Sequence, residues 1–279
     1  MTLLAILIAT LAAGIGSVWL AALLMTIGIM ARPGSLGPQH LLSLAAGALL
    51  ATAFMHLLPE AFEARIGSDT LFATLLVGLV FFFLLDKAEL WHHGHEHHHD
   101  HGAVARQSVN GEFPITGVYV PHHDHSHAPK AGGWAVLTGD SVHAFGDGVL
   151  IASAFMADLR LGAVAALAVL AHEVPHHMGD LVVLRQTSGN NQRAALVKVS
   201  LAGAVTALGG LLGYWLVDLL RDWLPHFLVV ASSSFIYVAL ADLIPQLQKR
   251  LSTRETMAQI AWLLLGIVLV TVVSRLAHH

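Results

Sequence analysis

The sequence predicts an all-α fold, a polytopic membrane bundle of about eight transmembrane helices. Hydrophobic residues make up 56% of the chain and charged residues only 11%, whereas charged residues are roughly 25% of a soluble domain. The mean hydropathy is +0.68. Apolar stretches of about 20 residues, the length that crosses a bilayer core of roughly 30 Å, recur along nearly the whole chain. The composition therefore excludes a water-soluble globular domain.

The apolar stretches divide the chain into eight predicted spans. The first lacks the basic start of a secretory signal and is about twice as long as a signal's apolar region, so we expect it to be a span. The predicted spans cover residues 3–30, 39–62, 69–90, 132–157, 161–185, 193–220, 225–248 and 255–276.

Residues 91–130 form one long polar stretch. It separates the first three spans, in residues 1–90, from the other five, in residues 131–279, and all eight spans belong to one membrane domain. Such a tract of His, Gly, Asp and Pro cannot build a packed core, and we expect a mobile loop. Its histidines are His92, His93, His95, His97, His98, His99, His101, His122, His123, His125 and His127.

The placement of Lys and Arg predicts the orientation, because cytoplasmic loops carry the excess of both residues. With the N-terminus outside, ten of them fall on the inner side and four on the outer side. The inner set is Arg32, Lys87, Arg106, Lys130, Arg185, Arg193, Lys198, Lys249, Arg250 and Arg254; the outer set is Arg65, Arg160, Arg221 and Arg275. Both termini are therefore expected outside, and the His-rich loop in the cytoplasm.

Ionisable side chains gather in the fourth and fifth predicted spans. Burying such a side chain in a membrane costs several kcal/mol unless it faces a cavity or pairs with another group. Three pairs are four residues apart, so each pair lies on one helix face: His143 with Asp147, His172 with His176, and His176 with Asp180. Glu173 stands three residues before His176.

If the two faces meet, imidazoles and carboxylates converge at membrane depth. Polar pairs that only bridge helices are the ordinary alternative for a single histidine. The chain has no cysteine, so thiolate sites are excluded and a metal must be held by nitrogen and oxygen, a set that suits zinc, iron(II), manganese or cobalt. Pro175 removes a backbone hydrogen bond within this cluster, as breaks at transport sites do.

Four segments resemble motifs of the ZIP family of metal-ion transporters. The fifth span, His172-Glu173-Val174-Pro175-His176-His177-Met178-Gly179-Asp180, is similar to the HExPHxxGD signature of the subfamily with two signature histidines, and His143–Gly148 is similar to HNFxDG. Residues 44–60 resemble the second span of the family, and residues 234–242 its seventh. The resemblance covers the whole chain.

The resemblance implies that His143, Asp147, His172, Glu173 and His176 form a transport site, with His56 as a further contributor along the pathway. Asp180 and Asp242 match motif positions without an assigned role. It implies movement of metal into the cytoplasm. We expect this to occur by alternating access, with zinc as the first candidate substrate and iron, manganese and cadmium as the others. Ala144 replaces an Asn, His177 a frequent Glu, and the sixth span has no carboxylate in its part with Ser200, Gly203 and Thr206. We therefore predict one metal and leave a second open.

Two other functions fit part of the pattern. Residues 172–176 satisfy the HExxH pattern of zinc metalloproteases, but Pro175 distorts the turn that such a site needs. A metal exporter of the cation-diffusion type would use the HxxxD pair of His143 and Asp147. Such an exporter is expected to have a second HxxxD pair and a soluble C-terminal domain, whereas this sequence has one such pair and ends at His279, directly after its last predicted span. We therefore expect a transporter and no enzyme.

The expected partners are a metal ion and membrane lipid, with no nucleic acid and no organic cofactor; a homodimer is left open. Neutral imidazole binds metals near neutral pH, so the His-rich loop is expected to buffer or sense the metal and to modulate transport. Metal affinity should fall at acid pH, since ligands must be deprotonated. The predicted location is a bacterial inner membrane, with an organelle membrane as the alternative.

Overall fold

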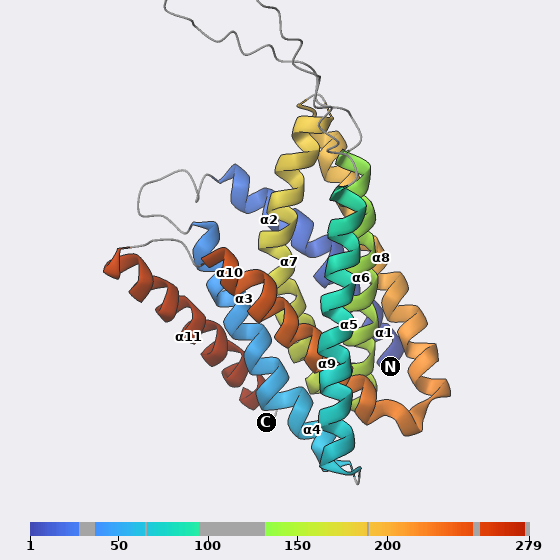
Figure 1. Cartoon of the computed structure of the whole chain (residues 1–279). Coiled ribbons are helices and arrows are strands. Elements are labelled where there is room, and N and C mark those ends of the chain that lie inside the picture. The colour runs from blue at the N-terminus through green and yellow to red at the C-terminus, as the bar shows by residue number, and fades with distance from the viewer. Residues whose placement is uncertain (28–36, 65, 95–131, 189, 248–251, 277–279) are drawn as a thin grey trace, which may run out of the picture.

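The chain folds into a bundle of helices (Figure 1). A computed structural model describes residues 1–27, 37–64, 66–94, 132–188, 190–247 and 252–276, and all regular structure in these ranges is helical. The α-helices are α1 (Thr2–Leu11), α2 (Ser17–Thr26), α3 (Pro38–Thr52), α4 (Leu58–Glu63), α5 (Ser68–Gly94), α6 (Gly132–Ala157), α7 (Leu159–Thr187), α8 (Gln192–Leu219), α9 (Leu224–Tyr237), α10 (Ile244–Leu247) and α11 (Thr253–Leu276). The other helical segments are three π-helical ones, η1 (Ala12–Gly16), η2 (Ala53–Leu57) and η4 (Val238–Leu243), and one 3-10 turn, η3 (Arg221–Trp223).

These helices confirm the predicted membrane bundle. Six helical stretches in the described ranges are long and apolar enough to cross a membrane: Thr2–Thr26, Gln39–Glu63, Ser68–Lys87, Gln192–Leu219, Arg221–Leu247 and Thr253–Arg275. The two other long helices, α6 with 26 residues and α7 with 29, carry the polar residues of the predicted site. At 1.5 Å per residue they extend about 39 and 43 Å, enough to span the bilayer. The protein is a multi-pass membrane protein.

The predicted His-rich stretch begins later than its composition suggested. Helix α5 continues to Gly94, so residues 91–94 of the stretch are helical, and residues 95–131 lie outside the described residues. The start of α1 and the C-terminal end of α11 lie at the same end of the bundle, as an even number of spans requires (Figure 1).

Two spans are interrupted by a π-helical segment that comes just before a proline. In the second span, the Leu58 N–H bonds the Ala53 carbonyl, five residues back, and Pro59 follows. In the seventh, the Ile244 N–H bonds the Ala239 carbonyl before Pro245. A proline ring clashes with the carbonyl four residues earlier, and the wider π-turn accommodates it. Helix α7, by contrast, continues through Pro175.

Helix α7 lies in the interior of the bundle, where α2, α3, α6 and α8 contact it (Figure 1). The most apolar windows of the second and seventh spans are 61% buried, whereas those of α5 and α11 are only 11% buried. Helices α5 and α11 therefore lie at the periphery, with apolar side chains directed outward. The polar face of α7 is enclosed by the central helices.

Glycines bring α6 and α8 close together. A Cβ added to Gly148 would strike backbone atoms between Thr206 and Gly210 of α8, and one added to Gly209 would strike the backbone of Phe145. Small residues at such positions let membrane helices approach closely. This contact fixes α6, which carries half of the predicted site.

Replacing Gly148 with Ala should destabilise the protein. The new Cβ meets backbone that cannot move aside, and overpacking of this kind costs about 1–3 kcal/mol. Thermal unfolding of the detergent-purified protein measures the loss. Gly146→Ala is the matched control, because nothing lies within 4 Å of the Cβ it adds and alanine favours a helix by about 1 kcal/mol over glycine. Equal effects of the two substitutions would contradict the close contact.

Candidate metal centre

Helices α6 and α7 form an antiparallel pair that places the predicted ligands opposite one another. Helix α6 ends at Ala157, and the Asp158 carboxylate caps α7 by accepting hydrogen bonds from the N–H groups of residues 160 and 161, at 2.8 and 3.1 Å. The connection is thus a single residue. The middle of α6, with His143 and Asp147, then meets the middle of α7, with His172 and Glu173.

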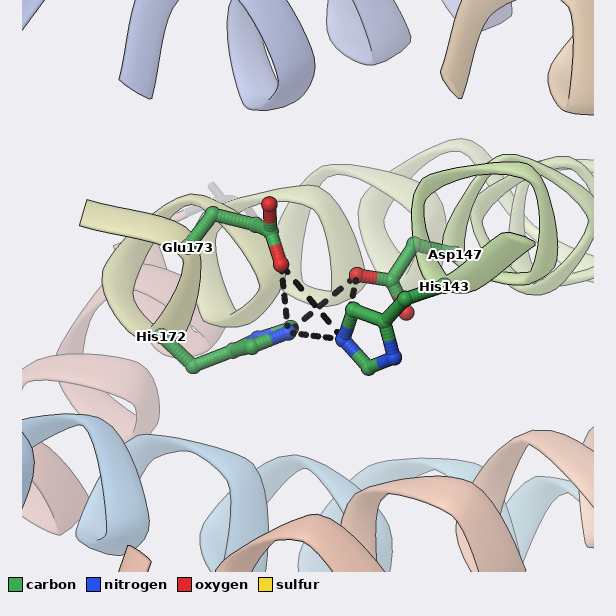
Figure 2. A group of neighbouring side chains, drawn as sticks. All are labelled: His143, Asp147, His172 and Glu173. Carbon is green, nitrogen blue, oxygen red and sulfur yellow. Dashed lines mark hydrogen bonds and ion pairs between the residues drawn. The ribbon is translucent and has the colours of Figure 1, made fainter. Parts of the chain in front are cut away.

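These four side chains, the first group, converge from the two helices (Figure 2). The His172 Nε2 atom lies 3.2 Å from Asp147 Oδ2 and 3.2 Å from Glu173 Oε1. The His143 Nε2 atom lies 3.4 Å from His172 Nε2, 3.5 Å from Glu173 Oε1 and 3.8 Å from Asp147 Oδ2. Two nitrogens and two oxygens therefore face a common centre.

The spacing of these atoms matches the shell of a zinc ion. Zinc binds His nitrogen and carboxylate oxygen at about 2.0–2.2 Å with tetrahedral geometry. The edge of a regular tetrahedron is about 1.6 times the centre-to-corner distance, so ligand atoms around zinc lie about 3.3–3.6 Å apart. The five measured separations, from 3.2 to 3.8 Å, are centred on this value.

A backbone contact orients His172 for metal binding. Its Nδ1 lies 3.3 Å from the carbonyl oxygen of Ala168. A carbonyl oxygen can only accept, so Nδ1 carries the proton and, in the neutral ring, Nε2 presents a lone pair to the first group. Metal-binding histidines are commonly held through the second ring nitrogen in this way.

Burial and charge also favour a bound cation. Asp147, His172 and Glu173 are 2–3% exposed, whereas the His143 side chain is 31% exposed and opens the group on one side. In the described part of the chain, the only ion-pair partners of the two carboxylates are histidines. With neutral imidazoles the group carries two buried negative charges, which are costly without a partner. One divalent cation neutralises them.

Two further groups adjoin the first. The second group is Asp140, Glu173 and His177, and the third group is Asp140, His176 and Asp180. The His177 Nε2 atom lies 3.1 Å from Glu173 Oε2 and 3.6 Å from Asp140 Oδ1. The His176 Nε2 atom lies 3.8 Å from Asp140 Oδ1 and 3.7 Å from Asp180 Oδ2. Glu173 and Asp140 are each shared, so the three groups form one continuous series.

The structure thus brings four of the seven predicted ligands into the first group and places two in the third. His176 remains next to the first group, since its ring stacks against that of His143 with centroids 5.7 Å apart. His56 lies in η2 with Nδ1 3.4 Å from the Ser274 hydroxyl, and within the described ranges it joins none of the three groups. Its contribution to the pathway stays a prediction.

Asp140 and His177 were not among the predicted ligands. Asp140 stands three residues before His143 and seven before Asp147, a spacing that places all three on one face of α6 and could have identified it. His177 follows Glu173 by four residues. From the sequence alone it is only a departure from the family motif.

The arrangement differs from that of an HExxH protease. In that site both histidines of the pattern bind the same zinc and the glutamate acts as a base. Here His172 and His176 belong to different groups, and Glu173 lies at ligand distance in the first. The metalloprotease interpretation has no geometric support.

Comparison with known proteins finds zinc transporters. Zinc transporter ZIP4 of Homo sapiens is 29% identical over 256 residues, which are 76% of this chain and 39% of that protein. Zinc transporter ZIP10 of Homo sapiens is 32% identical over 166 residues, covering 58% of this chain and 18% of its own length. The zinc transporter ZIP13 homolog of Drosophila melanogaster is 25% identical over 279 residues, covering 86% and 78%.

The chain accounts for less than half the length of the ZIP4 and ZIP10 relatives. The profile of the family described as ZIP zinc transporter matches residues 1–274, nearly the whole chain. The chain therefore belongs to the ZIP zinc transporter family.

Proposed function

We propose that this protein carries divalent transition-metal ions, zinc first, across the membrane into the cytoplasm, with the first group as the transport site. The observation that carries the proposal is the convergence of two imidazole nitrogens and two carboxylate oxygens from the middles of α6 and α7. Membership of the ZIP family supports transport.

In the proposed mechanism, the ligands replace the water that the ion loses. Asp147 and Glu173 supply two negative charges, and the fixed lone pair of His172 and the more exposed His143 complete the shell. Alternating access requires that helix groups then move relative to one another and open the site to the other side. Because Glu173 also contacts His177, an ion leaving the first group meets further ligands at once.

Zinc is proposed as the main substrate on two grounds. Two nitrogens and two oxygens at tetrahedral spacing suit zinc, and the relatives compared above are named zinc transporters. Manganese favours octahedral shells with more oxygen ligands, whereas iron(II) also accepts imidazole nitrogen and carboxylate oxygen; cadmium stays a further candidate substrate.

The apolar side chains on α5 and α11 support contact with membrane lipid. A homodimer and a bacterial inner membrane remain predictions from the sequence; the relatives compared above come from human and fly.

Substitution of a ligand in the first group should abolish uptake. We expect His143→Ala, His172→Ala and Glu173→Gln to lower zinc flux into proteoliposomes by at least about 10-fold, since even loss of an outer-shell partner weakens metal binding about 10–100-fold. A zinc-sensitive dye inside the vesicles measures the flux.

His226→Ala is the matched control for these variants. It removes a histidine that belongs to none of the three groups, and its flux should equal that of the unsubstituted protein. Full flux in the ligand variants would refute the proposed site, and flux in the outward direction alone would refute an importer.

Competition between metals should follow the donor set. Cadmium should inhibit zinc uptake at concentrations similar to those of zinc, and manganese should require at least about 10-fold more, because it prefers oxygen-rich octahedral shells. Uptake of radioactive zinc with each competitor measures this order. Stronger inhibition by manganese would show that the first group does not select the substrate.

Deletion of residues 95–127 should leave the pathway intact. The deletion removes His-rich sequence but spares the whole of α5, which ends at Gly94. We expect the maximal zinc flux to stay within about 2-fold of the full chain, because all three groups lie on α6 and α7. Loss of flux in a deletion variant that still folds and inserts would show that the stretch is part of the pathway.

A further inference from the structure

We propose that Gly146 of α6 and Gly179 of α7 border the passage of the metal ion, so that the space beside each glycine is part of the route. The inference deepens the proposed function and rests on it. Gly146 borders the first group. Gly179 borders the third group, toward the end of the bundle where α6 begins, which the placement of Lys and Arg predicts to be cytoplasmic.

The two glycines have no packing contact that requires glycine. Glycine weakens a helix interior relative to alanine, and elsewhere in the bundle it is needed because another backbone lies close. A Cβ added to Gly47, for example, would strike the carbonyl of Leu263. Among the glycines whose surroundings the structure describes, only Gly146 and Gly179 have no atom within 4 Å of the added Cβ, apart from their own helix backbone. Space is therefore left open beside both.

Both glycines follow an exposed histidine of the ligand groups by three residues. Gly146 follows His143, whose side chain is 31% exposed, and Gly179 follows His176, whose side chain is 42% exposed. A spacing of three keeps each glycine on the face of its helix that carries the histidine. The two rings stack with their centroids 5.7 Å apart. The open space thus adjoins the two most exposed rings of the three groups.

On α7 the exposed surface continues toward the end of the helix. His176, Gly179 and Val183 are all exposed, and their spacing of three and four residues places them on one face, the α7 strip. His177 and Leu181, on the other side of the helix, are 0% and 7% exposed. Because α2, α3, α6 and α8 all contact α7, the α7 strip borders space within the bundle.

The antiparallel arrangement places the two glycines at different depths. At 1.5 Å per residue, Gly146 is about 18 Å and Gly179 about 32 Å along its helix from Asp158, the residue that joins α6 to α7. On the same measure the first group lies about 17–23 Å from Asp158, and the third group about 27–33 Å. Gly146 is thus level with the first group and Gly179 with the third.

An ion that moves between ligand groups needs this room. When it leaves one group before the next holds it fully, water takes the place of the missing ligands, and each water occupies about 30 Å³. A side chain at either glycine would take the space of that water. Because the width of a route controls what passes through it, a larger residue should slow the ion without removing any ligand.

The size of the side chain at these positions should therefore set the maximal zinc flux. We expect Gly146→Leu and Gly179→Leu to lower flux into proteoliposomes at least about 10-fold, and the two alanine variants to keep it within about 3-fold, because width limits passage. Thermal unfolding of each detergent-purified variant shows whether it is folded.

Gly16→Leu is the matched control for the leucine variants. It adds the same side chain to a glycine of the first span, where the nearest atoms to the new Cβ, at 3.9 and 4.0 Å, belong to Leu11 and Ala12 of the same span. Gly16 adjoins none of the three groups in sequence. Its leucine variant should keep the flux within about 2-fold, because the route is not narrowed.

Thiol labelling tests the open space without any need for transport. The chain has no cysteine, so a single introduced cysteine reports its own surroundings. In vesicles with the full chain, Gly179→Cys should react with a membrane-impermeant thiol reagent that is added on the side of the His-rich stretch. Gly146→Cys should react as well, and saturating Zn²⁺ should slow that reaction several-fold, because an ion in the first group occupies the adjoining space.

Two control cysteines separate an aqueous route from the protein core and from lipid. Ser153→Cys lies on α6 at a fully buried position, and Val77→Cys lies at a 68% exposed position of the peripheral helix α5. Neither should react, because the reagent attacks the thiolate, which forms in water and not in apolar surroundings.

Two results would overturn the inference. The first is that Gly146→Cys and Gly179→Cys react no faster than the two control cysteines. The second is that the folded leucine variants transport zinc as Gly16→Leu does. If His172→Ala still abolishes uptake in either case, the proposed function stands and only the role of the glycines fails. If the unsubstituted chain moves no zinc, the proposed function fails, and the labelling still decides whether the space beside the glycines is open to water.

Discussion

Four carboxylates buried between α6 and α7 impose the constraint on which the site depends. Asp140, Asp147, Glu173 and Asp180 are at most 9% exposed, and within the described ranges they pair only with histidines. Such charges are not stable in a membrane interior unless cations accompany them. In the proposed transport site, one divalent cation would neutralise the two carboxylates of the first group, and Glu173 and Asp140 are each shared between neighbouring groups.

The packing of the bundle holds this series of ligands in place. Glycine contacts bring α8 against α6 at Gly148 and against η1 of the first span at Gly14, and η1, α6 and α8 all contact α7. The π-turns before Pro59 and Pro245 lie in other spans, while α7 continues through Pro175. The ligand-bearing helices are therefore regular, and their spacing of three and four residues is what aligns the side chains.

Departures from the family motif gain a physical meaning in the structure. His177, which replaces a frequent Glu, has its ring oriented by Ser17 and joins Asp140. Ala144 is 1% exposed and offers no ligand, whereas Asp140, one helical turn along α6, belongs to the second and third groups. A neutral imidazole in place of a carboxylate also lowers the buried negative charge by one.

By itself, the sequence determined the membrane class, the helical spans and the presence of ligand-type side chains on α6 and α7. Hydrophobic length and a spacing of four are local properties, and they survive folding because a helix must satisfy its own backbone in lipid. Tertiary structure alone decided which ligands meet. The separation of His176 from His172, the distance of His56 from the groups, and the contact of Ser17 with His177 across 160 residues depend on how helices cross and rotate. Crossing is set by contacts between distant glycines, such as Gly14 with Gly203, which no local pattern encodes.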